Sequence, residues 1–565
     1  MSVLTTSESR RDQAWKVPSG VKDGDKVRPP RQKWRWPIGL ALLSWAVYSA
    51  AAIWMTDTLH LEIGDSLARM SDARAMLFSR DPHLAAIGLY WMPLPTVGQL
   101  PFMLLLSPLH HAQLSGPLAC AFIGAVTVLV MARICWVLEL PTLLSGLLVG
   151  AYALSPIIVY TNGNGMSEAW SYFGCAVAML GYIRWSKRHN TMDLAVLATG
   201  LAIVMLVRYE ALLLTPIIAV ITALNDGQGP PDRTSLRGFI QDCRSRTRRW
   251  ATTASLVALP TYVVIGLWSF MQYVLVRNPF NWYDLQVSHG RTAPGAFGLP
   301  AYTAAGIGGY TLHLLVLIVP AVIVVGPALL LLRRRYHDIL TGLGILAGVL
   351  IWPAIVVIGL VLHDSSAAPR YFEPAIIFVA IGAIWLASVC RSWTGRIGRI
   401  GPAVLVVIMA AGAIAGTANL ENKNRTFLEN ENQVFDRVLG RPVAPLPLTA
   451  LAQAVVWRQV ANDLDPKLAA GARVMVDVSD TSAFIFTKYP GHYIVNSDRD
   501  YLKIVADFTG HFTYLIKAGP KAVGDEDTEF NEIIASTVGG HWIRWKSYPV
   551  AIVYQWIPAK SSPGP

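Results

Sequence analysis

Long apolar stretches recur through the first three quarters of this chain and constrain its fold more than any other feature. About 20 mostly apolar residues in a row cross the ~30 Å hydrocarbon core of a bilayer as a helix, and somewhat shorter runs do so when tightly packed. The stretches of this kind are residues 36–55, 115–137, 142–160, 168–185, 194–207, 209–224, 252–276, 308–332, 339–362, 371–389 and 400–418. The sequence therefore predicts an α-helical polytopic membrane protein with about eleven transmembrane helices in residues 36–418.

The composition agrees with a bilayer as the natural solvent. Hydrophobic residues make up 53% of the 565 residues and charged residues only 15%, whereas soluble domains carry about a quarter charged residues. A net charge of +11 suggests nucleic acid in a soluble protein, but here the basic residues cluster on alternate loops, so we expect no nucleic-acid partner. The five cysteines imply no disulfide framework.

The basic clusters predict the orientation. They fall at residues 16–35, 184–188, 233–249, 333–335 and 391–399, and the positive-inside rule assigns all of these to the cytoplasm. The basic leader, residues 1–35, is followed by no small-residue cleavage site, so we expect a cytoplasmic N-terminus and a retained first span. The outer face of the cell membrane then holds loops 57–114 and 277–307, turns 161–167 and 363–370, the tip at Arg208, and everything after residue 419.

Residues 93–107 are apolar but short and rich in proline, so they predict an interfacial or re-entrant helix within the first outer loop. The alternative is a true span, which would place the basic cluster 184–188 outside and break the charge pattern.

The pattern changes after residue 419, and residues 419–565 predict an extracytoplasmic α/β domain. An amphipathic helix begins at Thr449 and reaches about residue 463. β-rich runs follow at 473–478, 492–495, 513–517 and 543–556, the last broken at Pro549. The domain has no phosphate-cradling glycine motif and no metal-ligand spacing, which indicates a substrate-side or stabilising module.

The first outer loop carries the residues best suited to chemistry. If the segment from Ser66 onward is helical, Asp65, Arg69 and Asp72 stand on one face, with two carboxylates beside a guanidinium. A carboxylate there suits a general base, and the planar arginine fork matches phosphate oxygens. The structural alternative is Asp65 as a helix cap with a solvated salt bridge to Arg69.

These residues belong to a series of short motifs spread over nearly the whole chain. In order they are Gly64-Asp65, Asp72, Trp91-Met92-Pro93-Leu94-Pro95, Ala153-Leu154-Ser155-Pro156, Met166-Ser167-Glu168, Val207-Arg208-Tyr209-Glu210, Asn278-Pro279-Phe280 and Arg370-Tyr371-Phe372-Glu373-Pro374. The series resembles the GT-C superfamily of integral membrane glycosyltransferases, which use polyprenyl-phosphate sugars. The chain departs from that pattern in one respect: its two acidic residues are separated, whereas many members carry an adjacent pair.

The resemblance implies sugar transfer from a polyprenyl-phosphate donor, with inversion, to an envelope glycan, lipid or protein on the outer face. It implies Asp65 as the base, with Asp72 as the competing candidate, and a donor phosphate held by Arg69, Arg208 and Arg370. The candidates for substrate contacts are His83, Trp91, Glu168, Glu210 and Tyr371.

Most of these candidates also have a structural interpretation. Arg208 beside Glu210 suits an ion pair, because arginine near hydrocarbon needs a partner, and Arg370 suits snorkelling at a helix end. Glu168 suits the positive end of a helix dipole, His83 a wet interfacial position, and Trp91 with Tyr90 the headgroup belt. The aromatic loop 277–307 predicts a mobile lid, with a disordered linker as the alternative.

Two other classes of protein stay open at this point. Many helices and intramembrane arginines also suit a transporter or flippase of a lipid-linked intermediate, although no repeat of broken helices is evident. A non-catalytic scaffold for envelope enzymes is the third. The sequence does not identify the sugar, the acceptor or the length of the lipid chain. It indicates no cofactor, although a divalent cation stays possible, because the separated carboxylates alone neither predict nor exclude a metal site.

Overall fold

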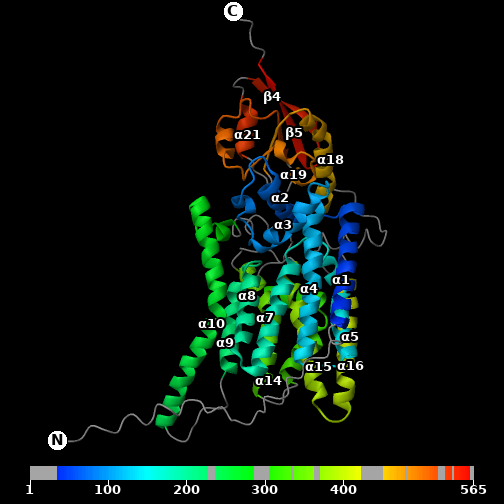
Figure 1. Cartoon of the computed structure of the whole chain (residues 1–565), viewed down its shortest axis with the longest axis vertical. Helices are drawn as coiled ribbons and strands as arrows, with labels where there is room; N and C mark the ends of the chain where they lie inside the picture. Colours follow the sequence, from blue (N-terminus) through cyan, green and yellow to red (C-terminus); the bar gives the residue numbers. More distant parts are fainter. Residues whose placement is uncertain are drawn as a thin grey trace, which may run out of the picture.

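The computed structural model describes residues 35–226, 236–285, 304–331, 336–361, 369–421, 450–477, 482–519, 528–536 and 540–559. A smaller α/β part lies at one end of a long helical part, and α2 and α3 lie between the two (Figure 1). The helices of the long part are α1 (Arg35–Ile53), α4 (Ser115–Val137), α5 (Thr142–Ala153), α6 (Pro156–Thr161), α7 (Glu168–Arg188), α8 (Thr191–Met205), α9 (Ala211–Asn225), α10 (Leu236–Val276), α12 (Ala304–Ile318), α13 (Val322–Leu331), α14 (Tyr336–Val361), α15 (Pro374–Arg391) and α16 (Arg396–Glu421).

All the predicted apolar stretches lie on helices, but not every stretch is one continuous helix. Among the described residues, six helices are long and apolar enough to cross a membrane, or seven if the bent pair of α12 and α13 forms one span. The six are Arg35–Thr58, Ala112–Val137, Arg246–Val276, Asp338–Val361, Arg370–Arg391 and Arg396–Asn419. The prediction of one helix over 142–160 was wrong, because the chain breaks at Ser155-Pro156 between α5 and α6. That over 308–332 was also wrong, since α12 and α13 meet at 102°. In both breaks a proline lacks the N–H that would continue the helical ladder.

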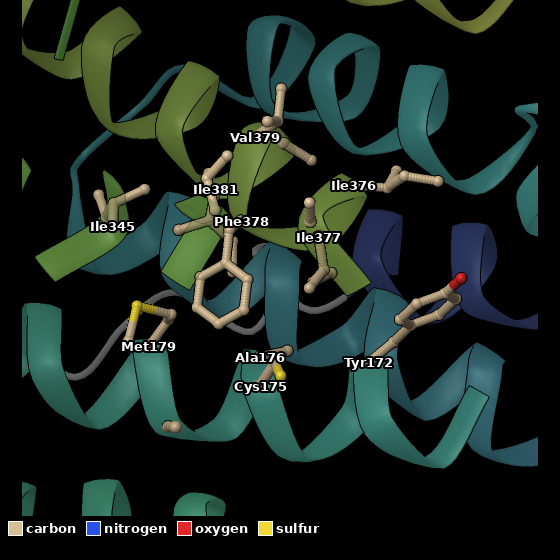
Figure 2. Packing of buried hydrophobic residues seen from close by; sticks show 14 of the residues in the cluster. Tyr172, Cys175, Ala176, Met179, Ile345, Ile376, Ile377, Phe378, Val379 and Ile381 are labelled. Carbon is tan, nitrogen blue, oxygen red and sulfur yellow. The ribbon is translucent and has the colours of Figure 1, made fainter. Parts of the chain in front are cut away.

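The helix α15 lies at the centre of the bundle, and nearly every one of its residues is buried. Figure 2 shows Ile377 and Phe378 of α15 pointing toward Cys175 and Ala176 of α7. The Phe378 ring also fills the space over Gly348 of α14, where an added Cβ would lie 2.1 Å from it. Such small-residue notches let helix backbones approach closely, which is how helices associate in membranes.

The backbones of α7 and α8 approach each other closely. An added Cβ on Gly200 would lie 2.2 Å from the backbone nitrogen of Ala178, and one on Gly181 would lie 2.3 Å from that of Leu197. Because the obstacles are backbone atoms, no side-chain rotation can relieve the clash.

Gly200→Ala should therefore destabilise the protein by about 1–3 kcal/mol, the usual cost of overpacking. Thermal unfolding of the purified protein in detergent measures this. Gly266→Ala is the matched control, because nothing lies within 4 Å of its added Cβ. It should be neutral or slightly stabilising, since alanine favours a helix over glycine. Equal stabilities for the two variants would contradict the packing described here.

The segment between α1 and α4 is a folded unit rather than an extended loop. It contains a π-helical turn (Trp54–Thr58), α2 (Gly64–Phe78), α3 (Leu94–Leu106) and two short 3₁₀ turns (Leu84–Ile87 and Ala112–Leu114). The predicted helix over 93–107 is confirmed as α3, and Leu104 and Leu105 on it are exposed apolar residues. Its depth in a membrane stays a prediction.

The C-terminal part is a three-layer α/β domain built on a five-stranded sheet in the order β2-β1-β3-β5-β4. Its elements are α18 (Ala450–Ala469), β1 (Val474–Val476), α19 (Ala483–Phe486), a 3₁₀ turn (Pro490–His492), β2 (Tyr493–Val495), α20 (Tyr501–Ala506), β3 (Tyr514–Ala518), α21 (Thr528–Ala535), β4 (Gly540–Ser547) and β5 (Ala551–Pro558). The strand β1 is parallel to β2 and β3, whereas β5 is antiparallel to both β3 and β4. The four predicted β-rich runs are confirmed, but α18 extends to Ala469, beyond the predicted end.

Alternation along the strands explains the layers. Val474 and Val476 of β1 share a buried cluster with Trp457 and Leu464 of α18, and Met475 faces the opposite cluster. The cluster under α18 also contains Ala75 and Met76 of α2. The apolar core of the domain therefore continues directly into the first loop of the helical part.

Four arginines reinforce this contact, two from each side. Arg74 of α2 donates to the carbonyl oxygens of Phe484, Ile485 and Thr487 at 2.6–2.9 Å, and to Ser107 at 3.2 Å. The other pairs are Arg80 with Asp498 and Asp500, Arg499 with Asp81, and Arg458 with Glu62. The domain is thus docked on the loop that carries the candidate acidic residues.

Candidate active site

The helix α2 holds Asp65 in its first turn, at the end that faces the helical part. Ile63 stands at the N-cap in extended conformation and makes no side-chain cap, so Asp65 is not the capping residue. Its Oδ2 accepts a hydrogen bond from Nη1 of Arg370 at 2.7 Å, and both side chains are about one-third exposed, 32% and 30%. The structure therefore brings together the candidate base and a candidate phosphate-binding arginine.

Arg370 lies on a 3₁₀ turn (Pro369–Phe372) that leads into α15. The ring of Tyr371 lies 5.5 Å from the guanidinium carbon of Arg370 and 5.5 Å from that of Arg208. Tyr371 thus lies between two of the predicted phosphate-binding arginines, and its π-face favours both cations.

Arg208 is held by two carboxylates. It lies 2.7 Å from Glu210 and 3.2 Å from Glu168, and all three are largely buried. Glu168 stands in the first turn of α7, where a carboxylate is favoured by the helix dipole. The ion-pair interpretation of Arg208 describes its contacts, and a role in phosphate binding stays a prediction.

Arg69 is buried on α2, four positions after Asp65. Its guanidinium carbon lies 4.6 Å from the ring of Trp91, and Nη1 lies 3.5 Å from the backbone oxygen of Asp65. Burial lowers the pKa of Arg69, and the charge of Asp65 opposes that shift. Trp91 therefore serves as the cation–π partner of Arg69 in this structure, which ties α2 to the start of α3.

Asp72 lies further along α2, next to Gly88. Gly88 has a φ of +79°, and a Cβ there would lie 2.3 Å from Asp72 Oδ2, so only glycine fits. Burial raises the pKa of Asp72 well above its usual value, Arg69 opposes this, and Asp477 of the C-terminal domain adds to it. The two candidate bases thus lie in different surroundings, Asp65 toward Arg370 and Asp72 toward the docked domain.

His83 is the candidate that the structure does not bring into this group. Its Nδ1 lies 2.6 Å from the backbone oxygen of Asp81, whose carboxylate pairs with Arg499. Within the part of the chain that the structure describes, no contact joins His83 to Asp65 or Arg370. Its position is at the docking surface of the domain.

Several residues near the site had no assigned role in the sequence. Gln272 of α10 donates to the carbonyl oxygen of Leu89 at 3.0 Å and accepts from the backbone N–H of Trp282 at 2.9 Å. The Trp282 ring stacks on Tyr209 at 4.5 Å, and Tyr209 donates to the carbonyl oxygen of Tyr90 at 3.3 Å. The beginning of the predicted lid is thus fastened to the chain before Trp91. The aromatic content of that loop was the signal, and the remainder, 286–303, lies outside the described residues.

Glu373 is a second such residue. It follows the Arg370-Tyr371-Phe372 motif, is buried, and accepts a hydrogen bond from Tyr172 at 3.2 Å. The hydrogen bond between Glu373 and Tyr172 joins the start of α15 to α7. No three His, Cys, Asp or Glu side chains among the residues placed by the structure are arranged to hold a metal ion, and a divalent cation stays a prediction.

No protein-family model and no curated protein matches this sequence. Among solved structures, the fold is similar to the crystal structure of ArnT from Cupriavidus metallidurans bound to undecaprenyl phosphate. The TM-score is 0.52 at 10% sequence identity, and the match covers 92% of this chain and 97% of that one. At this identity the likeness establishes the fold alone, and it confirms the predicted polytopic helical fold with a C-terminal α/β domain.

Proposed function

We propose that this protein is an inverting membrane glycosyltransferase that moves a sugar from a polyprenyl-phosphate donor to an envelope acceptor. The observation that carries the proposal is the pairing of Asp65 with Arg370 at 2.7 Å across 305 positions of sequence. The pair joins a carboxylate suited to proton abstraction with a guanidinium suited to phosphate. It lies in a fold similar to one solved with undecaprenyl phosphate bound.

In this proposal Asp65 takes the proton of an acceptor hydroxyl as its oxygen attacks the anomeric carbon. The bond from that carbon to the phosphate oxygen breaks on the opposite face, so the configuration inverts. The lipid phosphate leaves with the bonding electrons, and Arg370 stabilises the charge that develops on it. Arg69 and Arg208 add positive potential near the phosphate. The side chains that orient these two arginines and contact the sugar are Glu168, Glu210, Tyr371 and Trp91.

The proposed orientation follows from the basic clusters, with the N-terminus in the cytoplasm and the C-terminal domain outside. The domain and α2 lie at the same end of the molecule (Figure 1), so the proposed site faces outward. Reaction there requires a donor presented on the outer leaflet.

The test is sugar transfer by the purified protein in liposomes, offered a panel of polyprenyl-phosphate hexoses and pentoses with radiolabelled sugar. Consumption of one donor with release of polyprenyl phosphate supports the proposal and identifies the sugar. If no donor is consumed with any envelope-extract acceptor, and none binds to the protein, the proposal fails.

Arg370→Ala should weaken donor binding, because charge-assisted hydrogen bonds contribute about 1.5–3 kcal/mol each. That range corresponds to a rise of roughly 10–100-fold in donor Kd or KM. Binding of unlabelled polyprenyl phosphate, measured by competition, separates this effect from chemistry. Arg370→Lys keeps the charge without the planar fork and should recover part of the affinity. An unchanged donor affinity in Arg370→Ala would remove Arg370 from the phosphate site.

One observation favours a transporter instead, namely the 102° break between α12 and α13, because broken helices line the sites of many transporters. A transporter would move lipid-linked sugar across liposomes without cleaving it. Measuring the leaflet distribution and the chemical integrity of the lipid in the same vesicles discriminates the two functions.

A further inference from the structure

Arg458 reaches out of the C-terminal domain to the chain just before α2. Its Nη2 donates to the carbonyl oxygen of Thr56 at 3.1 Å and to Oε1 of Glu62. The guanidinium carbon also lies 4.5 Å from the ring of Phe486, which holds the arginine from its own domain. A single side chain therefore joins the end of the first span, the start of α2 and the docked domain.

The buried carboxylate of Glu62 is stabilised by its ion pair with Arg458. Its side chain is only 2% exposed, and Oε2 has no hydrogen-bond partner among the described residues. Burial raises the pKa of Glu62 to about 7, with Arg458 opposing the shift and Asp57 adding to it. A buried carboxylate of this kind is costly without its cation, so the loss of Arg458 forces Glu62 to move or to take up a proton.

Any movement of Glu62 is transmitted to Asp65. Glu62 stands between Leu61 and Ile63, which are buried at 4% and 5% exposure against Met55 and Met166. The extended Ile63 then leads directly into α2, and Asp65 follows Glu62 by three positions. The segment is thus held on one side by apolar packing and on the other by Arg458, and its position sets where Asp65 lies relative to Arg370.

We propose that Arg458 and Glu62 form a positioning pair through which the C-terminal domain holds the Asp65 carboxylate at the reacting centre. The inference rests on the proposed function for its kinetic part. Neither residue touches substrate in this proposal. The domain then has a catalytic purpose beyond stability, because it aligns the base from outside the helical part.

The chain provides a matched control in the other docking contacts. Arg499 also pairs a C-terminal arginine with an acidic residue of the first loop, Asp81, but its side chain is 71% exposed. Asp81 follows α2, whereas Glu62 precedes it. Removing Arg499 therefore removes one docking ion pair without disturbing the segment that leads to Asp65.

The kinetic arm compares Arg458→Ala, Arg458→Lys and Arg499→Ala in the liposome transfer assay. Displacement of a reacting group by about 1 Å costs up to 100-fold in rate. Arg458→Ala should therefore lower kcat by roughly 10–100-fold while the donor KM stays within about threefold of the wild type. Arg458→Lys should recover part of kcat, and Arg499→Ala should leave both constants unchanged. A normal kcat in Arg458→Ala overturns the proposal, and so does a loss of the same size in Arg499→Ala.

The second arm needs no substrate, so it separates failure of this inference from failure of the proposed function. Hydrogen–deuterium exchange of the full chain in detergent follows the amides of residues 59–70. Arg458→Ala should raise their exchange about tenfold through local opening, and Arg499→Ala should leave them as in the wild type. Unchanged exchange in Arg458→Ala overturns the coupling even if transfer is observed. If the wild type consumes no donor, the proposed function fails, and this arm still decides whether the pair holds the segment.

Discussion

Asp65→Asn is expected to lower sugar transfer by roughly 10²–10⁴-fold, the contribution of a positioned general base. Asparagine has nearly the same shape and retains an oxygen that accepts from Arg370, so the local fold should persist. What is lost is the ability to take the acceptor proton. The measurement is single-turnover transfer in liposomes with the donor that the panel identifies, together with donor binding, which should stay near the wild-type value.

Asp72→Asn is the matched control on the same helix. Because burial raises the pKa of Asp72, the amide resembles the protonated form that its surroundings favour. We expect transfer within about tenfold of the wild type. If Asp72→Asn stops transfer while Asp65→Asn does not, the assignment of the base is reversed and Asp477 becomes part of the reacting centre.

Arg74→Met is expected to have the largest effect on stability. The buried guanidinium donates to three backbone carbonyls of the C-terminal domain and to Ser107 after α3. Methionine fills a similar volume but donates nothing, so three carbonyl oxygens lose their partner. A buried polar group without a partner costs about 1–3 kcal/mol, which gives a loss of about 3 kcal/mol or more for the site as a whole.

Thermal unfolding in detergent measures this loss, and limited proteolysis shows whether the domain has separated from α2. Arg499→Met serves for comparison, because its exposed ion pair should contribute little. Equal unfolding temperatures for Arg74→Met and the wild type would show that the apolar contacts of Ala75 and Met76 hold the domain without the arginine.

Hydrophobic patterning was sufficient to predict most individual elements. Apolar length located the helices of the bundle, and runs rich in β-forming residues located the strands of the C-terminal sheet, because both are local properties of the sequence. The break at Pro320 between α12 and α13 was missed, since the residues on both sides are apolar and length alone favours one span. Pro156 was quoted as a motif, yet the stretch around it was still taken as one helix.

The site was predictable only where its residues share an element or a motif. Helical spacing grouped Asp65, Arg69 and Asp72 on α2, and adjacency grouped Arg208 with Glu210. The contact of Asp65 with Arg370 has no local signal, and Arg370 was named only because a resemblance supplied it. Arg458 and Glu62 were missed because docking of a domain across hundreds of positions leaves no periodicity in either segment.

The contact between α2 and the C-terminal domain joins two segments that are made at very different times during synthesis. Arg74 is made early, but the carbonyl of Phe484 that it binds lies 410 positions later. At about 5–20 residues per second, the first loop waits roughly 20–80 s for its partner to emerge, and both must reach the same side of the membrane. In a nascent or truncated chain, Arg74 therefore lacks the carbonyl oxygens that it binds in the complete fold, and the first loop is not yet held by the C-terminal domain. Under the proposed function, the site on α2 is therefore complete only after the C-terminal domain has been made and docked, and a chain that lacks this domain should be cut more readily by protease in its first loop.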